Sequence, residues 1–421
     1  MSGRFLRLIT IDEARRIIDA NIQAIGGFEI VPLIEADGRI LFEDLHAPVD
    51  LPPFNRALMD GYAVRSPDTF GATEEKGIRL KVIGEIRAGD AIEDLEVGRG
   101  EAVEVATGAR IPEGADSVLM VEFADRVGED ELIVYRHVAP GENIQMRGDD
   151  IRRGENLLRR GTGIHAREIG ILAALGMDQI KVLRRPRVCV ISTGNELEYP
   201  GRELREGKIF DANGYMITAA LLELGADASF IGVIRDSYDE LRGTLESAIS
   251  GGFDIVIISG GTSAGRGDIL YRVVEDLGEL LIHGVRIKPG KPFLFGLCRD
   301  VPIFGLPGYP VSAMITFETF VEPVLQRLTG TGPGEKKRVK ATVGARIHSA
   351  KGRHELMPVR LEDSSEGVIA YQVHGGSGAI RTLLDLDGYI RIGEEVEIVE
   401  EGEGVEVELR VGRMHLPPVP P

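Results

Sequence analysis

The chain has 421 residues, of which 43% are apolar and 28% charged, and its formal net charge is −18. This length predicts several domains, and this composition is typical of a soluble globular protein rather than a disordered or membrane-embedded one. The negative charge argues against a nucleic-acid partner, because proteins hold phosphate backbones through basic surfaces.

The chain begins with a predicted helix. Thr10 and Glu13 form a capping box, and apolar residues then recur at helical spacing until Gly26-Gly27. Residues 29–45 are expected to form a strand and a short helix. Three prolines between residues 48 and 53 indicate a domain boundary.

The pattern changes twice over the next 130 residues or so. Residues 51–143 predict a small β domain, with strands at 79–86, 101–106, 117–122 and 132–138. Residues 144–182 return to helix-forming sequence, and an amphipathic helix at 166–175 ends at Gly176.

Residues 183–330 alternate between strands and helices. Strands are predicted at 187–191, 228–234 and 254–259, and helices at 212–224, 238–250 and 269–277. Two short strands at 293–297 and 301–305 and a closing helix at 311–328 follow. This order predicts a doubly wound α/β domain with a mainly parallel sheet. Residues 335–412 are β-patterned again and predict a small barrel, and 413–421 form a proline-rich tail.

Targeting features favour the cytoplasm. No apolar run approaches the roughly 18 residues of a membrane-spanning helix, and the N-terminus lacks the short apolar core of a secretion signal. The two cysteines, Cys189 and Cys298, lie in apolar strand-like segments, so we expect buried, reduced thiols. We therefore expect a cytoplasmic protein without a membrane partner.

Three segments rich in glycine and proline lie close together, at residues 258–268, 287–293 and 304–312. Each exposes backbone, so that main-chain N–H groups can approach an anion closely. Together they predict one site for a phosphorylated ligand. The first is not a P-loop, because Arg266-Gly267 stands where a P-loop has Lys followed by Ser or Thr.

Acidic and basic residues accompany these segments. Glu196, Asp236 and Asp268 follow three successive predicted strands, whose carboxyl ends meet at one edge of a parallel sheet. Three carboxylates there favour a hard cation such as Mg²⁺. The alternative is that they cap helices. Lys288 and Lys291 flank Pro289-Gly290 and would face an anion, unless they are ordinary solvated lysines.

These segments, with residues 58–64, 106–109, 148–151 and 192–197, resemble the molybdopterin molybdenumtransferases. These are the MoeA-type enzymes of molybdenum-cofactor biosynthesis, related to the C-terminal part of gephyrin. The resemblance extends to about residue 410. It implies an elongated domain made of residues 1–50 and 144–182, which is split by the inserted β domain at 51–143. A molybdopterin-binding α/β domain at 183–330 and a C-terminal β-barrel at 335–412 complete the chain.

The resemblance also implies an activity. Molybdenum from molybdate, or tungsten from tungstate, would enter the dithiolene of adenylylated molybdopterin, with release of AMP and with Mg²⁺ as cofactor. The enzyme would be a homodimer whose cleft combines the β-rich part of one subunit with the α/β domain of the other. The molybdopterin adenylyltransferase is a candidate partner. Two other classes remain: a pterin carrier or scaffold without turnover, and a nucleotide hydrolase of the same fold.

Site residues follow from the matching motifs. The resemblance implies four catalytic acids, Asp60, Glu196, Asp236 and Asp268, with Glu196 and Asp268 as metal ligands. The implied substrate-binding residues are Thr107, Asp150, Gly260, Gly261, Ser263, Lys288, Lys291, Pro307, Pro310, Arg353 and Ser377. The alternative for Asp60-Gly61 is a hairpin turn.

The chain departs from the family's pattern at two positions. Tyr309 stands where the family usually has Asn, which leaves the shape of the oxyanion pocket and the choice between molybdate and tungstate open. Asn195 stands where Asp is common.

Overall fold

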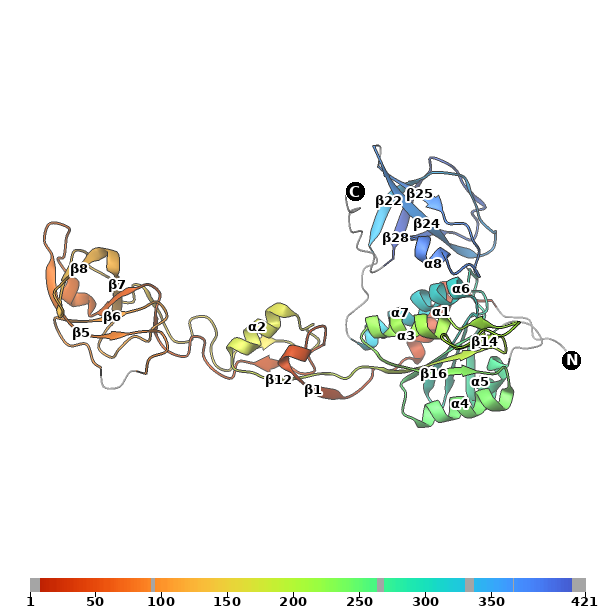
Figure 1. Cartoon of the computed structure of the whole chain (residues 1–421), viewed down its shortest axis with the longest axis horizontal. Coiled ribbons are helices and arrows are strands. Elements are labelled where there is room, and N and C mark those ends of the chain that lie inside the picture. Colours follow the sequence, from red (N-terminus) through yellow and green to blue (C-terminus); the bar gives the residue numbers. More distant parts are fainter. Residues whose placement is uncertain (1–7, 92–94, 263–268, 330–336, 366, 411–421) are drawn as a thin grey trace. The chain divides into compact units, whose positions relative to one another are not determined.

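A computed structural model describes residues 8–91, 95–262, 269–329, 337–365 and 367–410 (Figure 1). The chain divides into two compact units. One consists of Met1–Glu29 with Leu183–Pro421, and the other of Ile30–Val182.

The larger unit contains a six-stranded sheet of order β16-β13-β17-β21-β20-β18. Its four parallel strands are β13 (Arg187–Thr193), β16 (Asp227–Ile234), β17 (Ile255–Ser259) and β21 (Val301–Leu306). β20 (Leu294–Cys298) and the edge strand β18 (Gly278–His283) complete it through antiparallel pairs. The predicted mainly parallel sheet is confirmed. β18 was not predicted, because it follows a helix directly without a turn sequence.

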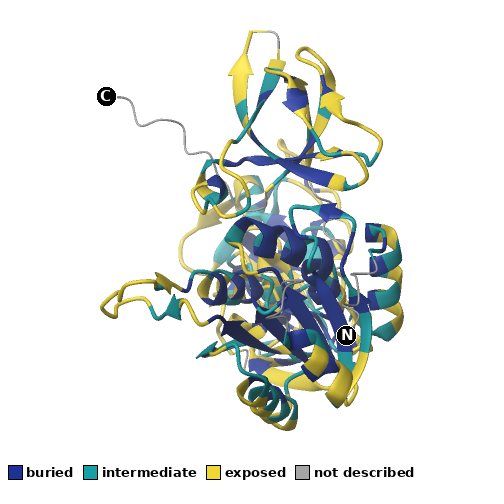
Figure 2. Cartoon of the chain, turned by 90° about the vertical axis from the view of Figure 1, so that its right-hand side faces the viewer, coloured by how far each residue is buried: buried dark blue, intermediate teal, exposed yellow. Residues whose placement is uncertain are grey.

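Helices cover both faces of this sheet (Figures 1 and 2). They are α3 (Asn213–Glu223), α4 (Tyr238–Ser250), α5 (Leu270–Leu277), α6 (Pro310–Thr316) and α7 (Glu322–Leu328), the last two joined by a π-helical turn at Phe317–Val321. Val188 and Val190 of β13 pack with α3, α6 and α7, whereas Cys189 and Ile191 pack with α4 and α5. Successive side chains of a strand point to opposite faces, so one strand serves two cores.

Both cysteines are buried and free, as predicted. Burial raises the pKa of Cys189 to about 12 and that of Cys298 to about 11. The thiolate is the reactive form of cysteine, so neither thiol is poised for chemistry at neutral pH.

The N-terminal helix α1 (Ile11–Asn21) packs differently from the expectation. Thr10 Oγ1 accepts a hydrogen bond from Glu13 N at 3.2 Å, which confirms the N-cap, but the helix ends at Asn21, before the glycines. Its buried residues Ile11, Ala14 and Ile18 belong to the α/β core, whereas the resemblance implies a place for this helix in the elongated domain. An apolar stripe shows that a helix buries one face, but it does not show which element covers that face.

A closed barrel follows in the same unit, as predicted. Its strands are β22 (Arg338–Val343), β24 (His354–Ser364), β25 (Gly367–Gln372), β26 (Gly388–Ile392) and β28 (Gly404–Leu409). Pairing of β24 with β26 closes the ring. β19 (Ile287–Lys288), from the α/β domain, pairs with β24 in parallel and places Lys288 beside Glu355. This short strand joins the barrel to the α/β domain.

The second unit contains the elongated segment and the β insert. β1 (Phe28–Pro32) pairs with β12 (Gln179–Leu183), and β2 (Leu45–His46) pairs with β11 (Asn156–Leu158). Val31, Leu33 and Leu41 share a core with Ile164 and with Leu172 of α2 (Ala166–Ala174). Two segments far apart in sequence therefore pack together around an insertion, as the split domain requires.

The insert is a six-stranded sheet of order β7-β4-β6-β5-β9-β8, which agrees with the predicted small β domain. Its strands are β4 (Gly61–Val64), β5 (Ile78–Ile86), β6 (Glu101–Val105), β7 (Ser117–Met120), β8 (Ala124–Val127) and β9 (Glu131–Val134). β3 (Arg56–Ala57) and β10 (Ile144–Gln145) form a separate pair beside it. In the part of the chain that the structure describes, no helix is long and apolar enough to cross a membrane.

Candidate active site

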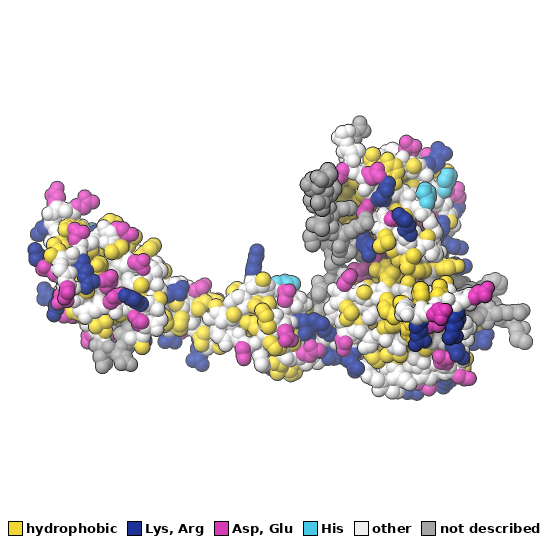
Figure 3. Space-filling model, viewed as in Figure 1, with side chains coloured by type: hydrophobic (Ala, Val, Ile, Leu, Met, Phe, Trp, Pro, Cys, Tyr) yellow, Lys and Arg dark blue, Asp and Glu magenta, His cyan; other side chains and the backbone are white. Residues whose placement is uncertain are grey.

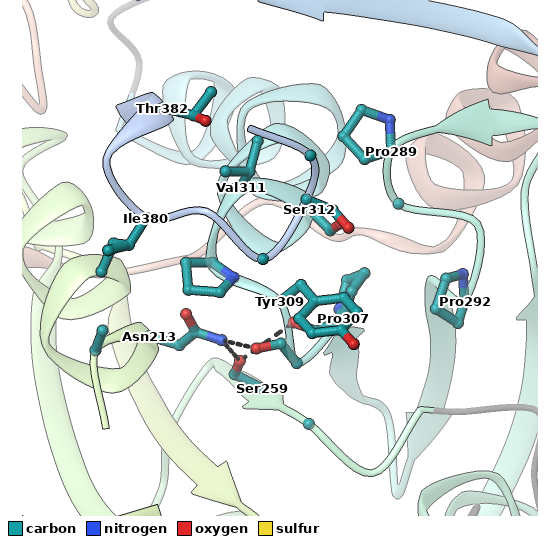
Figure 4. Close-up of a pocket in the computed structure, with 18 of the residues that line it drawn as sticks. Asn213, Ser259, Pro289, Pro292, Pro307, Tyr309, Val311, Ser312, Ile380 and Thr382 are labelled. Atoms are coloured by element: carbon teal, nitrogen blue, oxygen red, sulfur yellow. Dashed lines mark hydrogen bonds between the residues drawn. The ribbon is translucent and has the colours of Figure 1, made fainter. Parts of the chain in front are cut away.

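A cleft of about 1350 Å³ lies between the carboxyl ends of the parallel strands and the barrel (Figure 4). It brings together most of the residues predicted for this region. Those that line it are Glu196, Asp236, Gly260, Gly261, Lys288, Lys291, Pro307, Pro310 and Ser377. Arg353 is half-buried but does not line the cleft. Ser263 and Asp268 lie outside the described residues.

The loop after β17 runs close to the end of β13. Gly260 has φ +96°, and a Cβ built there would lie 2.2 Å from the carbonyl oxygen of Thr193. Gly260 N donates to Leu306 O at 3.1 Å. Only glycine fits this position, which agrees with the prediction of a loop that brings bare backbone to the cleft.

The two described acids at the strand ends differ in their surroundings. The Glu196 carboxylate lies over Gly194, where a Cβ would be 2.9 Å from each of its oxygens, and it has no hydrogen-bond or ion-pair partner among the described residues. Asp236 Oδ1 accepts from Thr193 Oγ1 at 2.7 Å, and Asp236 N donates to Asn195 Oδ1 at 3.3 Å. Asp236 is thus held by its neighbours, whereas Glu196 is available to a ligand.

Neither acid caps a helix. Glu196 precedes the short strand β14 (Leu197–Glu198), and the N-cap of α4 is Ser237 rather than Asp236. In the described ranges, no group of three His, Cys, Asp or Glu side chains could hold a metal ion. A magnesium site that includes Asp268 therefore stays a prediction, and Glu196 is the described acid suited to it.

The two lysines of the Lys-Pro-Gly-Lys turn also differ. Gly290 has φ +119°, and a Cβ there would lie 2.5 Å from Thr316 Cγ2, so the turn requires glycine. Lys288 Nζ lies 2.9 Å from Glu355 Oε1, whereas Lys291 lines the cleft without an ion-pair partner in the described part of the chain. The sequence predicts that both lysines bind an anion. Because Glu355 lies far downstream of Lys288, the local charge pattern does not indicate that the two form an ion pair.

Glu355 is a buried carboxylate, only 5% exposed. Besides Lys288 it accepts hydrogen bonds from Ser349 Oγ at 2.7 Å and from Ala350 N at 3.2 Å, both through Oε2. The ion pair joins the barrel to the Lys-Pro-Gly-Lys turn, and the two hydrogen bonds hold Glu355 within the barrel.

Sequence reasoning missed a polar network at the start of α3. Asn213 Nδ2 donates to Ser259 Oγ and to Gly308 O, both at 2.8 Å. Asp211 accepts from Ser192 Oγ at 2.9 Å. Asp211 stands just before the helix predicted at 212–224, a capping position that could have indicated this network.

Exposed apolar side chains surround the cleft. Ile209, Phe210, Tyr309 and Ile380 line it, and each is at least 43% exposed. Figure 3 shows hydrophobic side chains gathered where the barrel meets the α/β domain. Tyr309 therefore presents a flat ring at a position where a small amide is usual in the resembling family. Such a surface suits a planar ring better than a phosphate.

The remaining predicted residues lie in the second unit. Asp60 Oδ1 accepts from Thr107 N at 2.6 Å and from Thr107 Oγ1 at 2.8 Å. The Thr107 backbone N–H, and then its hydroxyl, lower the pKa of Asp60. Asp150 is exposed, and its backbone N donates to Leu51 O at 3.1 Å. Asp60 and Thr107, 47 residues apart in sequence, thus form one pair.

Asp60-Gly61 is not a hairpin turn. Gly61 begins β4, which lies between β6 and β7 in the sheet. A Cβ on Gly61 would lie 2.0 Å from Leu119 O, so the glycine permits close strand packing.

On the face shown in Figure 3, Lys and Arg are interspersed with Asp and Glu on both units.

Comparison with known proteins covers nearly the whole chain. The matching family descriptions are "MoeA N-terminal region (domain I and II)" over residues 9–176, "Probable molybdopterin binding domain" over 189–327 and "MoeA C-terminal region (domain IV)" over 340–409. The molybdopterin molybdenumtransferase 2 of Mycobacterium tuberculosis is 34% identical over 94% of this chain and 98% of its own length. The chain belongs to the MoeA family.

Other MoeA relatives agree. The molybdopterin molybdenumtransferase of Haemophilus influenzae is 33% identical over 95% of this chain and 98% of its own. The crystal structure of the molybdopterin biosynthesis MoeA protein from Pyrococcus horikoshii has a TM-score of 0.84 at 39% identity, and the match covers 96% of this chain and 99% of that one. The MoeA architecture of several domains is therefore shown for this chain.

Proposed function

We propose that this MoeA-family chain is a molybdopterin molybdenumtransferase that inserts molybdenum from molybdate into adenylylated molybdopterin. AMP is released and molybdenum cofactor is formed. The observation that carries the proposal is the cleft, which places the Gly260-Gly261 backbone, Lys291 and Glu196 around one cavity of about 1350 Å³. Drug-sized ligands occupy pockets of about 300–1,000 Å³, so this cavity has room for a pterin joined to a nucleotide.

Each group has a role suited to its surroundings. The Gly260 and Gly261 backbone approaches phosphate oxygens, and the Lys291 ammonium offers a charge-assisted contact to a phosphate or oxyanion. Glu196, which has no partner among the described residues, would hold Mg²⁺ together with Asp268. A Mg²⁺ ion held there would offset the charge of the adenylate's pyrophosphate and would polarise it for cleavage.

The metal goes to the two dithiolene sulfurs of the substrate, so the reaction requires no protein thiolate. The state of Cys189 and Cys298 is consistent with this, because burial keeps both thiols protonated.

The proposal also covers the oligomeric state and the cellular location. We infer a cytoplasmic homodimer in which the Asp60–Thr107 pair of one subunit contributes to the cleft of its partner. The molybdopterin adenylyltransferase, which would supply the adenylylated substrate, is the expected transient partner. Tungstate is the alternative oxyanion.

The test is release of AMP from adenylylated molybdopterin by the purified protein and Mg²⁺, with molybdate, with tungstate and without either. We expect release that depends on an oxyanion. AMP release at the same rate without any oxyanion would identify a hydrolase. Binding of the substrate without AMP release under any condition would identify a carrier.

A further inference from the structure

Asn213 ties together two loops of the cleft. It is the first residue of α3 and only 6% exposed. Its Nδ2 donates to Ser259 Oγ at the end of β17 and to Gly308 O in the loop after β21, both at 2.8 Å (Figure 4). The loops that follow two neighbouring strands are therefore held by one side-chain amide.

A buried acid fixes the backbone at Asn213. Asp211 is 3% exposed and accepts from Ser192 Oγ at 2.9 Å, while its Oδ1 accepts from the backbone N–H groups of Asn213 at 3.1 Å and Gly214 at 3.3 Å. Gly308 O can only accept a hydrogen bond, so the nitrogen of the Asn213 amide must face it. The orientation of the amide is thereby determined.

This orientation leaves Asn213 Oδ1 without a partner. In the described part of the chain it is one of three buried side-chain oxygens without one, and Asn213 lines the cleft. Figure 4 shows this oxygen on the side of the amide away from Ser259. A buried acceptor left unpaired is unfavourable, so a donor from a bound molecule is favoured there.

The surroundings restrict the kind of donor. An amide oxygen cannot donate, and the Asp211 carboxylate close by makes the position unfavourable for a phosphate or an oxyanion. Pro310, Val311 and Ile380 also line the cleft, and they supply apolar surface for a ring. The position thus suits an N–H group carried by a planar heterocycle.

We propose that Asn213 Oδ1 accepts a hydrogen bond from the exocyclic amino group of a nitrogen heterocycle bound in the cleft. Such a group occurs both in a pterin, at position 2, and in adenine, at position 6. The inference rests on the proposed function, because both rings belong to the proposed substrate. Asn213 is then a substrate-binding residue that selects a ring with an amino group, and it also positions the two loops.

The experiment measures binding of two matched pairs of probes to the full chain by calorimetry. One pair is AMP and purine riboside 5′-monophosphate, which lacks the amino group. The other is pterin-6-carboxylate and the 4-oxopteridine-6-carboxylate without the 2-amino group. For one pair, we expect the wild-type protein to prefer the amino-bearing probe about tenfold, the effect of one neutral hydrogen bond. The pair that shows this preference identifies the ring.

Variants separate recognition from packing. Asn213→Ala should lose the preference. Ser192→Ala is the matched control, because Ser192 supports Asp211 but does not line the cleft. It should lower the melting temperature and leave the preference unchanged. If melting shows that Asn213→Ala is unfolded, Asn213→Ser takes its place.

Equal affinity of the wild-type protein for both members of each pair would overturn the inference, as would a preference that persists in Asn213→Ala. Either result leaves the proposed function standing if AMP release still depends on molybdate. A wild-type protein that binds none of the four probes and releases no AMP would contradict both.

Discussion

Replacing Lys291 by alanine should weaken anion binding far more than replacing Lys288, although the two residues flank the same turn. Lys291 lines the cleft, and the described residues provide no ion-pair partner for it. A charge-assisted hydrogen bond contributes about 1.5–3 kcal/mol, so its loss should reduce affinity roughly tenfold to hundredfold. The free ammonium should also make wild-type affinity fall as salt concentration rises.

The Lys288 ammonium, in contrast, already has an ion-pair partner. It lies 2.9 Å from the Glu355 carboxylate, and the Lys288 side chain is 41% exposed. An incoming anion meets a nearly neutral pair, and such partly exposed contacts contribute about 0.2–1 kcal/mol. We expect Lys288→Ala to reduce affinity at most about fivefold. It should lower stability instead, because it leaves a buried carboxylate with only its Ser349 and Ala350 donors.

Glu355→Gln provides a control with the opposite sign. Its side-chain oxygen can still accept from Ser349 and Ala350, but the negative charge beside Lys288 is gone, so anion affinity should rise. Molybdate and AMP are titrated calorimetrically against the wild type and the three variants at low and high ionic strength. Equal losses in the two lysine variants, or an unchanged affinity in Glu355→Gln, would refute the different roles assigned to the lysines.

Three further predictions use the same protein. Glu196→Gln should fold normally and lose most molybdate-dependent AMP release, roughly tenfold or more for the loss of one charged ligand contact. The control variant Glu203→Gln, on the exposed loop nearby, should retain AMP release. Wild-type turnover of Glu196→Gln at low Mg²⁺ would remove Glu196 from the site. Light scattering should give the mass of a dimer. A mixture of the inactive variants Asp60→Ala and Glu196→Ala should regain activity. If activity does not recover although subunit exchange is verified, each cleft is built within one chain. Burial raises the pKa of Cys189 to about 12 and that of Cys298 to about 11. Iodoacetamide should therefore label both thiols only after unfolding. Rapid labelling of the native protein would contradict their burial.

The elements of the α/β domain could be predicted because their residue patterns are local. The helix predicted at 238–250 is α4, and the strand predicted at 301–305 is β21 within one residue. The rule that ligands bind at the carboxyl ends of parallel strands then predicts that Glu196, Gly260 and Pro307 lie in one region.

Contacts between distant parts of the chain could not be predicted in this way. The partner of Lys288 is Glu355, in the barrel, and the partner of α1 is the α/β core. Each depends on how separate elements pack, which hydrophobic spacing does not encode. Asn213 was missed for a related reason, because its two bonds reach loops 46 and 95 residues away.

The central claim is tested most directly by counting products in one reaction. The purified protein is incubated with adenylylated molybdopterin, Mg²⁺ and molybdate, and the AMP released and the molybdenum bound to pterin are measured together. The proposed function predicts equal amounts of the two, rising together with molybdate concentration. AMP released without molybdenum bound to pterin, or independently of molybdate, would contradict it.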